Sequence, residues 1–313
     1  MPPEIAVISS TIVTAPDLLD RLKSHFTVHL MHEPGSYDAE AAKRCRAITT
    51  SGGTRVDAGT FDAFPEAGLV ASFGVGYDSI DVAEAKRRGI RVTNTPGVLT
   101  DEVADLAIGL AIAVCRDLVT GDAYVRSGAW ERQGALPLKR KVSGMRAGIL
   151  GLGGIGLAIA RRAAAFDMDL AWSGPRPKPD QPLPYLPSAV ELAARSDLLF
   201  VCCPGGAETR HLVNAEVLKA LGPEGYLINV ARGSVVDERA LVAALEAGSI
   251  AGAGLDVFEE EPKVPEALKN SPKVVLQPHV GSATVATRRA MGDLVFRNLE
   301  AWFAGRELVT PVA

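Results

Sequence analysis

Residues 148–156 read GILGLGGIG, and this stretch decides the fold. Gly151, Gly153 and Gly156 form a G-x-G-x-x-G pattern. Alone the pattern is weak, because glycines also mark ordinary tight turns without a ligand. Here a strand-like run, AGIL, precedes it and a helix-like run, LAIARRAAAF, follows it. This order is typical of a dinucleotide-binding loop, in which the N–H groups of a helix N-terminus face a pyrophosphate.

Short apolar runs alternate with helix-like segments through most of the chain. In the first part, strands are predicted at 4–8, 27–30, 46–50, 69–73 and 90–94. From Arg146 onward, strands are predicted at 147–150, 169–173, 198–202, 226–230, 252–257 and 273–276. Such alternation is typical of parallel sheets flanked by helices, and six strands complete a dinucleotide-binding fold. The sequence therefore predicts an α/β protein with doubly wound parallel sheets.

The length of 313 residues favours two domains. Thr100, followed by Asp101 and Glu102, predicts the start of a helix whose apolar residues recur with helical period. We place the domain boundary there. An amphipathic segment near the C-terminus is expected to pack back on the first domain. The expected domains are 1–99, completed by a C-terminal helix at 285–313, and 100–284.

Composition excludes several classes of partner. The net charge is -4, and no run of Lys or Arg forms a nucleic-acid or anionic-membrane patch. The longest apolar stretch, 106–115, is shorter than the roughly 20 residues of a membrane-spanning helix. The N-terminus resembles a first strand and not a signal peptide. The four cysteines lack metal-ligand spacing, so we expect no metal and reduced thiols in a soluble cytoplasmic protein.

The stretch AWSGPRPKPD at 171–180 bears on the choice of dinucleotide. About twenty residues after the glycine loop, an NAD site usually carries an Asp or Glu that binds a ribose hydroxyl. This chain has Ser173, Arg176 and Lys178 instead. These side chains can donate charge-assisted hydrogen bonds to the extra phosphate of NADP, which a carboxylate would repel. The stretch predicts NADPH as the cofactor; the alternative is a solvated loop whose cations face water.

Candidate catalytic residues follow predicted strands. His279, in VVLQPHVGSAT, lies at the edge where an open parallel sheet binds ligands, and a neighbouring carboxylate could make it a general acid. The segment LDVFEEEP offers Asp256, Glu259, Glu260 and Glu261, among which spacing does not choose. Arg232, in INVARG, could bind a carboxylate in a bidentate manner or form an ordinary surface ion pair. For the other histidines, His25, His29, His32 and His211, an incidental environment is favoured.

Taken in order, GLGGIG, INVARG, LDVFEEEP and QPHVGSAT resemble the D-isomer-specific 2-hydroxyacid dehydrogenases. SFGVGYDSID and GIRVTNTPGVLTDEVADLAIGL extend the resemblance over most of the chain. Within that family the chain is most similar to NADPH-dependent hydroxypyruvate, glyoxylate or hydroxyphenylpyruvate reductases. The resemblance implies a flavodoxin-like substrate domain, a Rossmann cofactor domain and an active site in the cleft between them. It also implies hydride transfer from NADPH to a small 2-keto acid, giving a D-2-hydroxy acid.

The resemblance also assigns roles to residues. It places the catalytic roles on Arg232, Glu261 and His279. Substrate contacts are expected at Val75, Gly76, Arg232, His279 and Ser282, with backbone N–H groups of the first two receiving the carboxylate. Cofactor contacts are expected at Gly151, Gly153, Gly154, Ile155, Gly156, Ser173, Arg176, Lys178, Cys203, Pro204, Thr209, Val230, Ala231, Asp256 and Gly281. The cations in SGPRPKP are spaced unusually for the family, which leaves open whether Arg176 or Lys178 contacts the phosphate.

Related enzymes pair through the long helix after Thr100 and the following loop, here GAWERQGALPLKRK. We therefore expect a homodimer that buries Trp130. A second class of protein shares the fold and even the triad: dinucleotide-sensing transcriptional corepressors. Those proteins usually carry extra tails for partner contacts, whereas this sequence has little beyond the expected core, so the reductase is the favoured interpretation.

Overall fold

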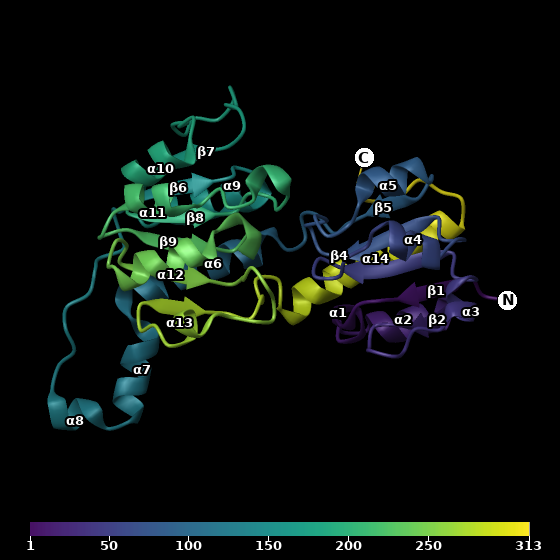
Figure 1. Cartoon of the computed structure of the whole chain (residues 1–313), viewed down its shortest axis with the longest axis horizontal. Coiled ribbons are helices and arrows are strands. Elements are labelled where there is room, and N and C mark those ends of the chain that lie inside the picture. The colour runs from purple at the N-terminus through teal and green to yellow at the C-terminus, as the bar shows by residue number, and fades with distance from the viewer. Residues whose placement is uncertain (313) are drawn as a thin grey trace. The chain divides into compact units, whose positions relative to one another are not determined.

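The computed structural model describes residues 1–312, which divide into two compact units. The first unit comprises Met1–Leu99 and the chain from Ser282 onward, and the second comprises Thr100–Gly281. Each unit is built on a parallel sheet with helices on its faces (Figure 1). The predicted α/β class with two parallel-sheet domains is confirmed.

The first unit holds a five-stranded parallel sheet of order β2-β1-β3-β4-β5. This is the flavodoxin-like strand order. The strands are β1 (Glu4–Val7), β2 (Thr27–Leu30), β3 (Ala47–Ser51), β4 (Leu69–Phe73) and β5 (Arg91–Thr93). The helices are α1 (Ser10–Val13), α2 (Leu18–His25), α3 (Ala39–Ala42), α4 (Ala58–Ala63), α5 (Val82–Arg87) and α14 (Val285–Phe303).

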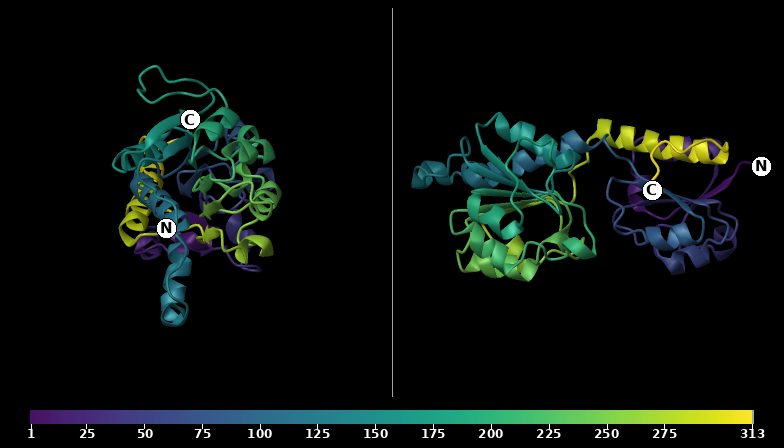
Figure 2. Two further views of the ribbon diagram at one scale, coloured as in Figure 1. Left: turned by 90° about the vertical axis from the view of Figure 1, so that its left-hand side faces the viewer. Right: turned by 90° about the horizontal axis from the view of Figure 1, so that it is seen from above.

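Helices cover both faces of this sheet. Every residue of β3 and β4 is buried, as expected for central strands of a parallel sheet. Helix α14 packs against β4 and α2. Figure 2 shows α14 on one face of this sheet and α4 and α5 on the other. The amphipathic C-terminal segment therefore completes the first unit.

Helix α14 ends at Phe303 and does not extend to 313, so the predicted length of this helix is wrong. Gly305 adopts a left-handed φ of 66°, and the N–H of Arg306 donates to the carbonyl of Ala301 at 2.8 Å. Glycine at this position is a common helix terminator, because its left-handed conformation costs little. The chain then turns back along β5, where the N–H of Val312 donates to the carbonyl of Val92 at 2.8 Å.

The second unit holds a six-stranded parallel sheet of order β11-β10-β9-β8-β6-β7. The strands are β6 (Arg146–Leu150), β7 (Asp169–Ser173), β8 (Leu198–Val201), β9 (Tyr226–Asn229), β10 (Gly252–Leu255) and β11 (Val274–Leu276). The chain reverses its direction of winding between β6 and β8, and an isolated parallel bridge from Trp172 to Tyr185 continues the sheet beyond β7. Ligands of doubly wound sheets bind at such a reversal, outside the carboxyl ends of the strands.

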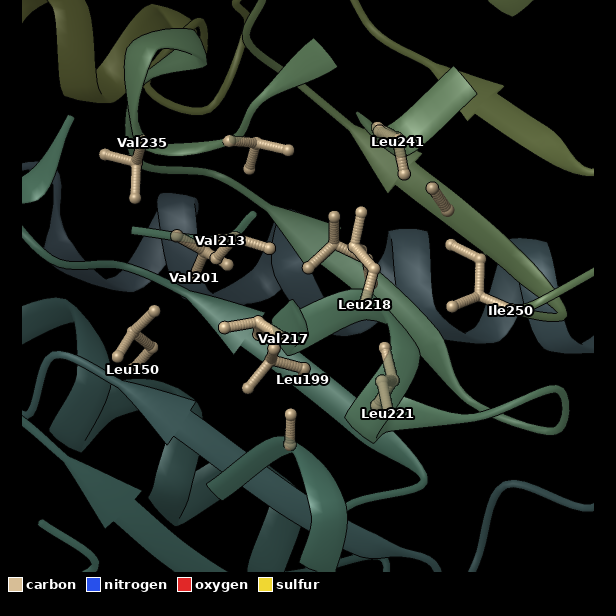
Figure 3. Close-up of a cluster of buried hydrophobic side chains, with 14 of the residues drawn as sticks. Leu150, Leu199, Val201, Val213, Val217, Leu218, Leu221, Val235, Leu241 and Ile250 are labelled. Atoms are coloured by element: carbon tan, nitrogen blue, oxygen red, sulfur yellow. The ribbon is translucent and has the colours of Figure 1, made fainter. Parts of the chain in front are cut away.

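The helices of this unit are α6 (Thr100–Arg116), α7 (Leu118–Arg126), α8 (Ala129–Gln133), α9 (Gly154–Ala164), α10 (Ala189–Arg195), α11 (Ala215–Leu221), α12 (Glu238–Glu246) and α13 (Glu266–Lys269). Two 3-10 turns, η1 (Ala207–Thr209) and η2 (Gly233–Val235), follow β8 and β9. The core between the sheet and α10–α12 is aliphatic, with Leu199, Leu218 and Leu241 among its members (Figure 3). This packing fixes the strand ends that carry the predicted site.

Helices α7 and α8 form an arm with the loop at 134–142, and the arm extends away from the sheet of the second unit (Figure 1). Helix α7 buries none of its residues. Leu118, Val125, Trp130 and Leu138 are exposed there. The arm therefore presents apolar side chains that the second unit itself does not cover.

In residues 1–312 no helix has the length and apolar character needed to cross a membrane.

Candidate active site

The glycine loop joins β6 to α9 at the reversal of the sheet. Gly151 has a φ of 99°, and a Cβ there would lie 2.6 Å from the Cα of Cys203. A Cβ on Gly156 would lie 2.2 Å from the carbonyl oxygen of Gly151. A Cβ on Gly153, by contrast, would meet open space. Gly153 is the N-cap of α9, so no side chain caps the N-terminus of this helix. The loop is tight against the protein on one side and open on the other.

The start of α9 offers unused donors beside this open space. Among the described residues, the N–H groups of Gly154, Ile155 and Gly156 donate to no protein acceptor. Unused N–H groups at a helix N-terminus bind anions, and the helix dipole favours negative charge there. The residues present therefore fit the pyrophosphate of a dinucleotide.

The end of β7 lies beside this loop, because the N–H of Gly151 donates to the carbonyl of Ser173 at 2.9 Å. No carboxylate ends this strand. Lys178 Nζ donates to the carbonyl oxygen of Leu152 at 2.6 Å. Arg176 is exposed and has no hydrogen-bond or ion-pair partner within residues 1–312. The two predicted phosphate contacts thus differ, since Lys178 is engaged with the protein and Arg176 is not.

The other predicted cofactor positions of the second unit follow the carboxyl ends of β8 to β11. They are Cys203, Pro204 and Thr209 after β8, Val230 and Ala231 after β9, Asp256 after β10, and Gly281 after β11. Thr209 lies in η1 and donates from Oγ1 to the carbonyl of Pro204 at 2.7 Å. Because the carboxyl ends of parallel strands meet at one edge of a sheet, these residues share the edge with the glycine loop.

Arg232 follows β9 in a segment fixed by Asn229. The Asn229 side chain accepts the N–H of Ala231 and donates to the carbonyl of Arg232, both at 3.0 Å. Arg232 Nη1 donates to the carbonyl of Ala231 at 2.8 Å. A Cβ on Gly233 would lie 1.8 Å from the carbonyl carbon of Phe258. The segment after Arg232 therefore lies directly on the segment that leads to Glu261.

Glu261 and His279 form a hydrogen-bonded pair. The Nδ1 of His279 lies 2.7 Å from Oε2 of Glu261. Oε1 of Glu261 accepts the N–H of Phe258 at 3.1 Å, which orients the carboxylate. The side chains of His279 and Glu261 remain 42% and 33% exposed, so a ligand can reach the imidazole. Of the four acids in LDVFEEEP, Glu261 is the one whose carboxylate is hydrogen-bonded to the His279 imidazole.

The charge of Glu261 is stabilised despite partial burial. Burial raises the pKa of Glu261. The hydrogen bond to His279, the charges of His279 and Arg232, and the hydrogen bond from the Phe258 N–H together lower it by more than burial raises it. The net result is a pKa below the ordinary range of a glutamate. Glu261 is therefore a carboxylate at neutral pH, and a carboxylate on Nδ1 leaves Nε2 as the reactive nitrogen of the imidazole.

Asp256 holds the segment that carries His279. It is 2% exposed, and its carboxylate accepts the N–H groups of Val280 at 2.7 Å and Gly281 at 2.9 Å. Burial raises the pKa of Asp256, and these two hydrogen bonds oppose the rise. The carbonyl of Asp256 accepts the N–H of His279 at 2.8 Å. Sequence reasoning gave Asp256 a cofactor contact and missed this anchoring role, for which the sequence has no spacing signal.

The predicted substrate contacts Val75, Gly76 and Ser282 lie in the first unit. The carbonyl of Val75 accepts from Asn94 Nδ2 at 2.8 Å, and the carbonyl of Gly74 accepts the N–H of Thr95 at 2.9 Å. In the described part of the chain, the N–H groups of Val75 and Gly76 donate to no protein acceptor. The loop after β4 is thus fixed through its carbonyls and leaves N–H donors for an anion.

No three His, Cys, Asp or Glu side chains within residues 1–312 are grouped to hold a metal ion. Cys45, Cys115, Cys202 and Cys203 are free thiols. Burial raises the pKa of Cys45 and of Cys203 to about 11, which makes both thiols unreactive near neutral pH. His29 pairs with Glu4 and His211 with Glu259.

A glycine loop lies at the reversal of the parallel sheet, and Arg232, Glu261 and His279 follow neighbouring strands. This arrangement is typical of dinucleotide-dependent oxidoreductases. Residues 108–281 match the family model described as D-isomer specific 2-hydroxyacid dehydrogenase, NAD binding domain. The chain belongs to the D-isomer specific 2-hydroxyacid dehydrogenase family.

Individual relatives are similar over most of their length. The hydroxyphenylpyruvate reductase of Plectranthus scutellarioides is 53% identical over 87% of this chain and 86% of its own. A glyoxylate/hydroxypyruvate reductase of Arabidopsis thaliana is 52% identical over 85% of both chains. The NADPH-dependent glyoxylate/hydroxypyruvate reductase of Sinorhizobium meliloti, solved with NADP and malonate, is 48% identical. Its structure matches with a TM-score of 0.93, covering 100% of this chain and 97% of that one.

Proposed function

We propose that this protein is an NADPH-dependent reductase that converts small 2-keto acids to D-2-hydroxy acids. The observation that carries the proposal is the 2.7 Å contact between His279 Nδ1 and Glu261 Oε2, at the sheet edge that also bears Arg232 and the glycine loop. Relatives named as glyoxylate, hydroxypyruvate and hydroxyphenylpyruvate reductases support these three acids as substrates.

The chemistry divides among few groups. When bound, the reduced nicotinamide supplies the hydride for the carbonyl carbon. Protonated His279, held by Glu261 through Nδ1, donates a proton from Nε2 to the carbonyl oxygen. The guanidinium of Arg232 binds the substrate carboxylate and polarises the carbonyl. In the first unit, the N–H groups of Val75 and Gly76 and the residue Ser282 are proposed as further substrate contacts, as the family resemblance implies.

NADPH is proposed over NADH on three grounds. First, β7 does not end in a carboxylate. Second, the side chains of Ser173 and Arg176 can donate hydrogen bonds to a phosphate. Third, the S. meliloti relative was solved with NADP. Since Lys178 already donates to the carbonyl of Leu152, Arg176 is the cation we assign to the phosphate.

A homodimer and a cytoplasmic location complete the proposal. The exposed apolar side chains of the α7–α8 arm support pairing with a second copy. The free cysteines support a reducing compartment.

The test is NADPH oxidation measured with glyoxylate, hydroxypyruvate and hydroxyphenylpyruvate. His279→Ala should lower kcat by at least about 100-fold, because general acid catalysis is lost. His29→Asn is the matched control, since His29 lies within β2, and it should retain wild-type turnover. Near-normal turnover in His279→Ala would remove the histidine from the mechanism. Dinucleotide binding without turnover of any 2-keto acid would favour the corepressor class instead.

A further inference from the structure

The segment Phe258–Glu261, here called the strap, carries two glutamates that each pair with a histidine. Glu261 lies 2.7 Å from His279 Nδ1, and Glu259 Oε1 lies 2.6 Å from His211 Nε2. Both histidines adopt the left-handed conformation, with φ of 53° and 51°, which is uncommon for residues other than glycine. The proposed function uses the first pair and leaves the second pair without a role.

Glu238 contacts the strap from the start of α12. Its Oε1 accepts the N–H of Glu259 at 2.8 Å. Glu238 is 9% exposed, and burial raises its pKa, as do the nearby charges of Glu259, Glu260 and Glu261, while the bond from the Glu259 N–H opposes the rise. Placing a carboxylate in this buried, acidic setting costs free energy, and the hydrogen bond from the Glu259 N–H offsets part of that cost.

His211 and Glu238 extend from two segments that are hydrogen-bonded to each other. The N–H of His211 donates to the carbonyl of Ser234 at 2.8 Å, and the N–H of Asp237 donates to the carbonyl of Val213 at 3.0 Å. These two paired segments, 211–213 and 233–237, are here called the platform. The second segment begins directly after Arg232, and its Gly233 lies against Phe258 of the strap.

The strap is therefore fixed at Glu259 in two ways, two residues before Glu261. Glu238 holds the backbone N–H, while His211 and Arg210 hold the side chain at 2.6 and 3.0 Å. The next contact along the strap is the bond from the Phe258 N–H to Glu261, which sets the direction of the carboxylate. Phe258 is packed in the hydrophobic core, so release of Glu259 would loosen the Glu261 end of that bond.

We propose that Glu238 and His211 are positioning residues that aim Glu261 at the catalytic His279. This inference rests on the proposed function. Neither residue touches the reacting atoms in this assignment. Their effect is to keep the Glu261 carboxylate within hydrogen-bonding distance of the imidazole, so that the imidazole is protonated and correctly oriented when the carbonyl is reduced.

The test compares Glu238→Ala with Glu238→Gln. Alanine removes the acceptor of the Glu259 N–H, whereas glutamine retains a carbonyl oxygen in the same place. Glu238→Ala should lower kcat by roughly tenfold, since displacement of a positioned group by an ångström can cost ~100-fold. Glu238→Gln should stay within about twofold of wild type, because the hydrogen bond is kept. Glu260→Gln, an exposed acid of the same strap, is the matched control and should leave kcat unchanged.

The pH profile separates positioning from a merely structural role. In Glu261→Gln, the alkaline fall in reductase activity should move to lower pH, because the protonated imidazole loses its negative partner. Glu238→Ala and His211→Gln should move it in the same direction by a smaller amount, and Glu238→Gln should not. A purely structural role would lower the melting temperature of these variants and leave the pH midpoint unchanged, which would overturn the proposal.

Two further arms keep the test decisive. If Glu238→Ala does not fold, His211→Gln carries the test, because the His211 side chain is 34% exposed and its replacement leaves the platform backbone intact. If the wild-type enzyme reduces no 2-keto acid, the proposed function fails, and protonation of the His279 ring is followed by NMR in the same variants. An unchanged ring titration in both Glu238→Ala and His211→Gln would overturn the positioning role independently of activity.

Discussion

At the scale of single residues, the end of β7 carries the side chains on which we base the NADPH proposal. Ser173 is 3% exposed and bonded through its carbonyl to the N–H of Gly151, so its position relative to the glycine loop is fixed. Lys178 is engaged with Leu152, whereas Arg176 is exposed and has no hydrogen-bond or ion-pair partner within residues 1–312. Under the NADPH proposal, a 2'-phosphate at this strand end would meet the Ser173 hydroxyl and the Arg176 guanidinium and no carboxylate.

Wild-type kcat/KM should therefore favour NADPH over NADH by at least about tenfold. Each charge-assisted bond to the phosphate is worth about 1.5–3 kcal/mol, and 1.4 kcal/mol is about a factor of ten. Ser173→Asp combined with Arg176→Ala should shift the preference toward NADH. Lys178→Ala is the control, expected to weaken both cofactors alike because Lys178 supports the loop that both share. If the double variant keeps its NADPH preference, Arg176 of the wild-type protein is a solvated surface cation that does not contact the phosphate.

The His279–Glu261 pair shows how far the sequence alone leads. Strand ends and residue chemistry brought His279 and four acids into consideration, and the family resemblance selected Glu261. Two sets of contacts with backbone N–H groups were not predictable from the sequence. Glu238 accepts an N–H 21 residues away, and Asp256 accepts N–H groups 24 and 25 residues away. Such contacts depend on how loops pack against one another, and neither periodicity nor a sequence motif predicts loop packing.

At the scale of elements, strands were predicted closely and the last helix was not. Strands buried on both faces give continuous apolar runs, so β4 and β7 were predicted with their observed bounds. The pattern after Ser282 continues past Phe303, but Gly305 ends the helix and the chain returns along β5. The side chain that fixes this return is Asn298, which lies within α14 and is completely buried.

Asn298→Ala should destabilise the first unit by about 2–4 kcal/mol, because a buried N–H left unpaired costs about 1–3 kcal/mol. The Asn298 side chain accepts the N–H groups of Val309 and Thr310 at 2.9 and 3.1 Å. It also donates to the Leu294 carbonyl and to Thr310 Oγ1, both at 2.8 Å. Urea denaturation followed by circular dichroism measures the loss. Arg297→Ala, an exposed neighbour on the same helix, should change stability by less than about 0.5 kcal/mol. Equal stability of both variants would contradict this role.

At the scale of the whole molecule, the α7–α8 arm is difficult to explain in a single chain. Leu118, Val125 and Trp130 are 52%, 56% and 60% exposed, and Leu138 in the following loop is fully exposed. Soluble monomers seldom expose large apolar side chains together, so a second surface is expected to cover them. Most soluble oligomers are symmetric homo-oligomers, and dimers are the commonest. An arm that extends from one unit suits exchange between two copies.

Light scattering at micromolar concentration should therefore give twice the 32.9 kDa mass of one chain. Replacing Trp130 with Ser and Leu138 with Asp removes an apolar anchor and places a charge in the interface, so this double variant should scatter as a monomer. Tyr37→Ser removes an exposed aromatic residue of the first unit, 52% exposed, and should leave the mass doubled. Circular dichroism should match wild type for all variants, since the arm contributes little to the core and Tyr37 is exposed. A wild-type monomer, or an equal loss of mass in Tyr37→Ser, would assign the arm another partner.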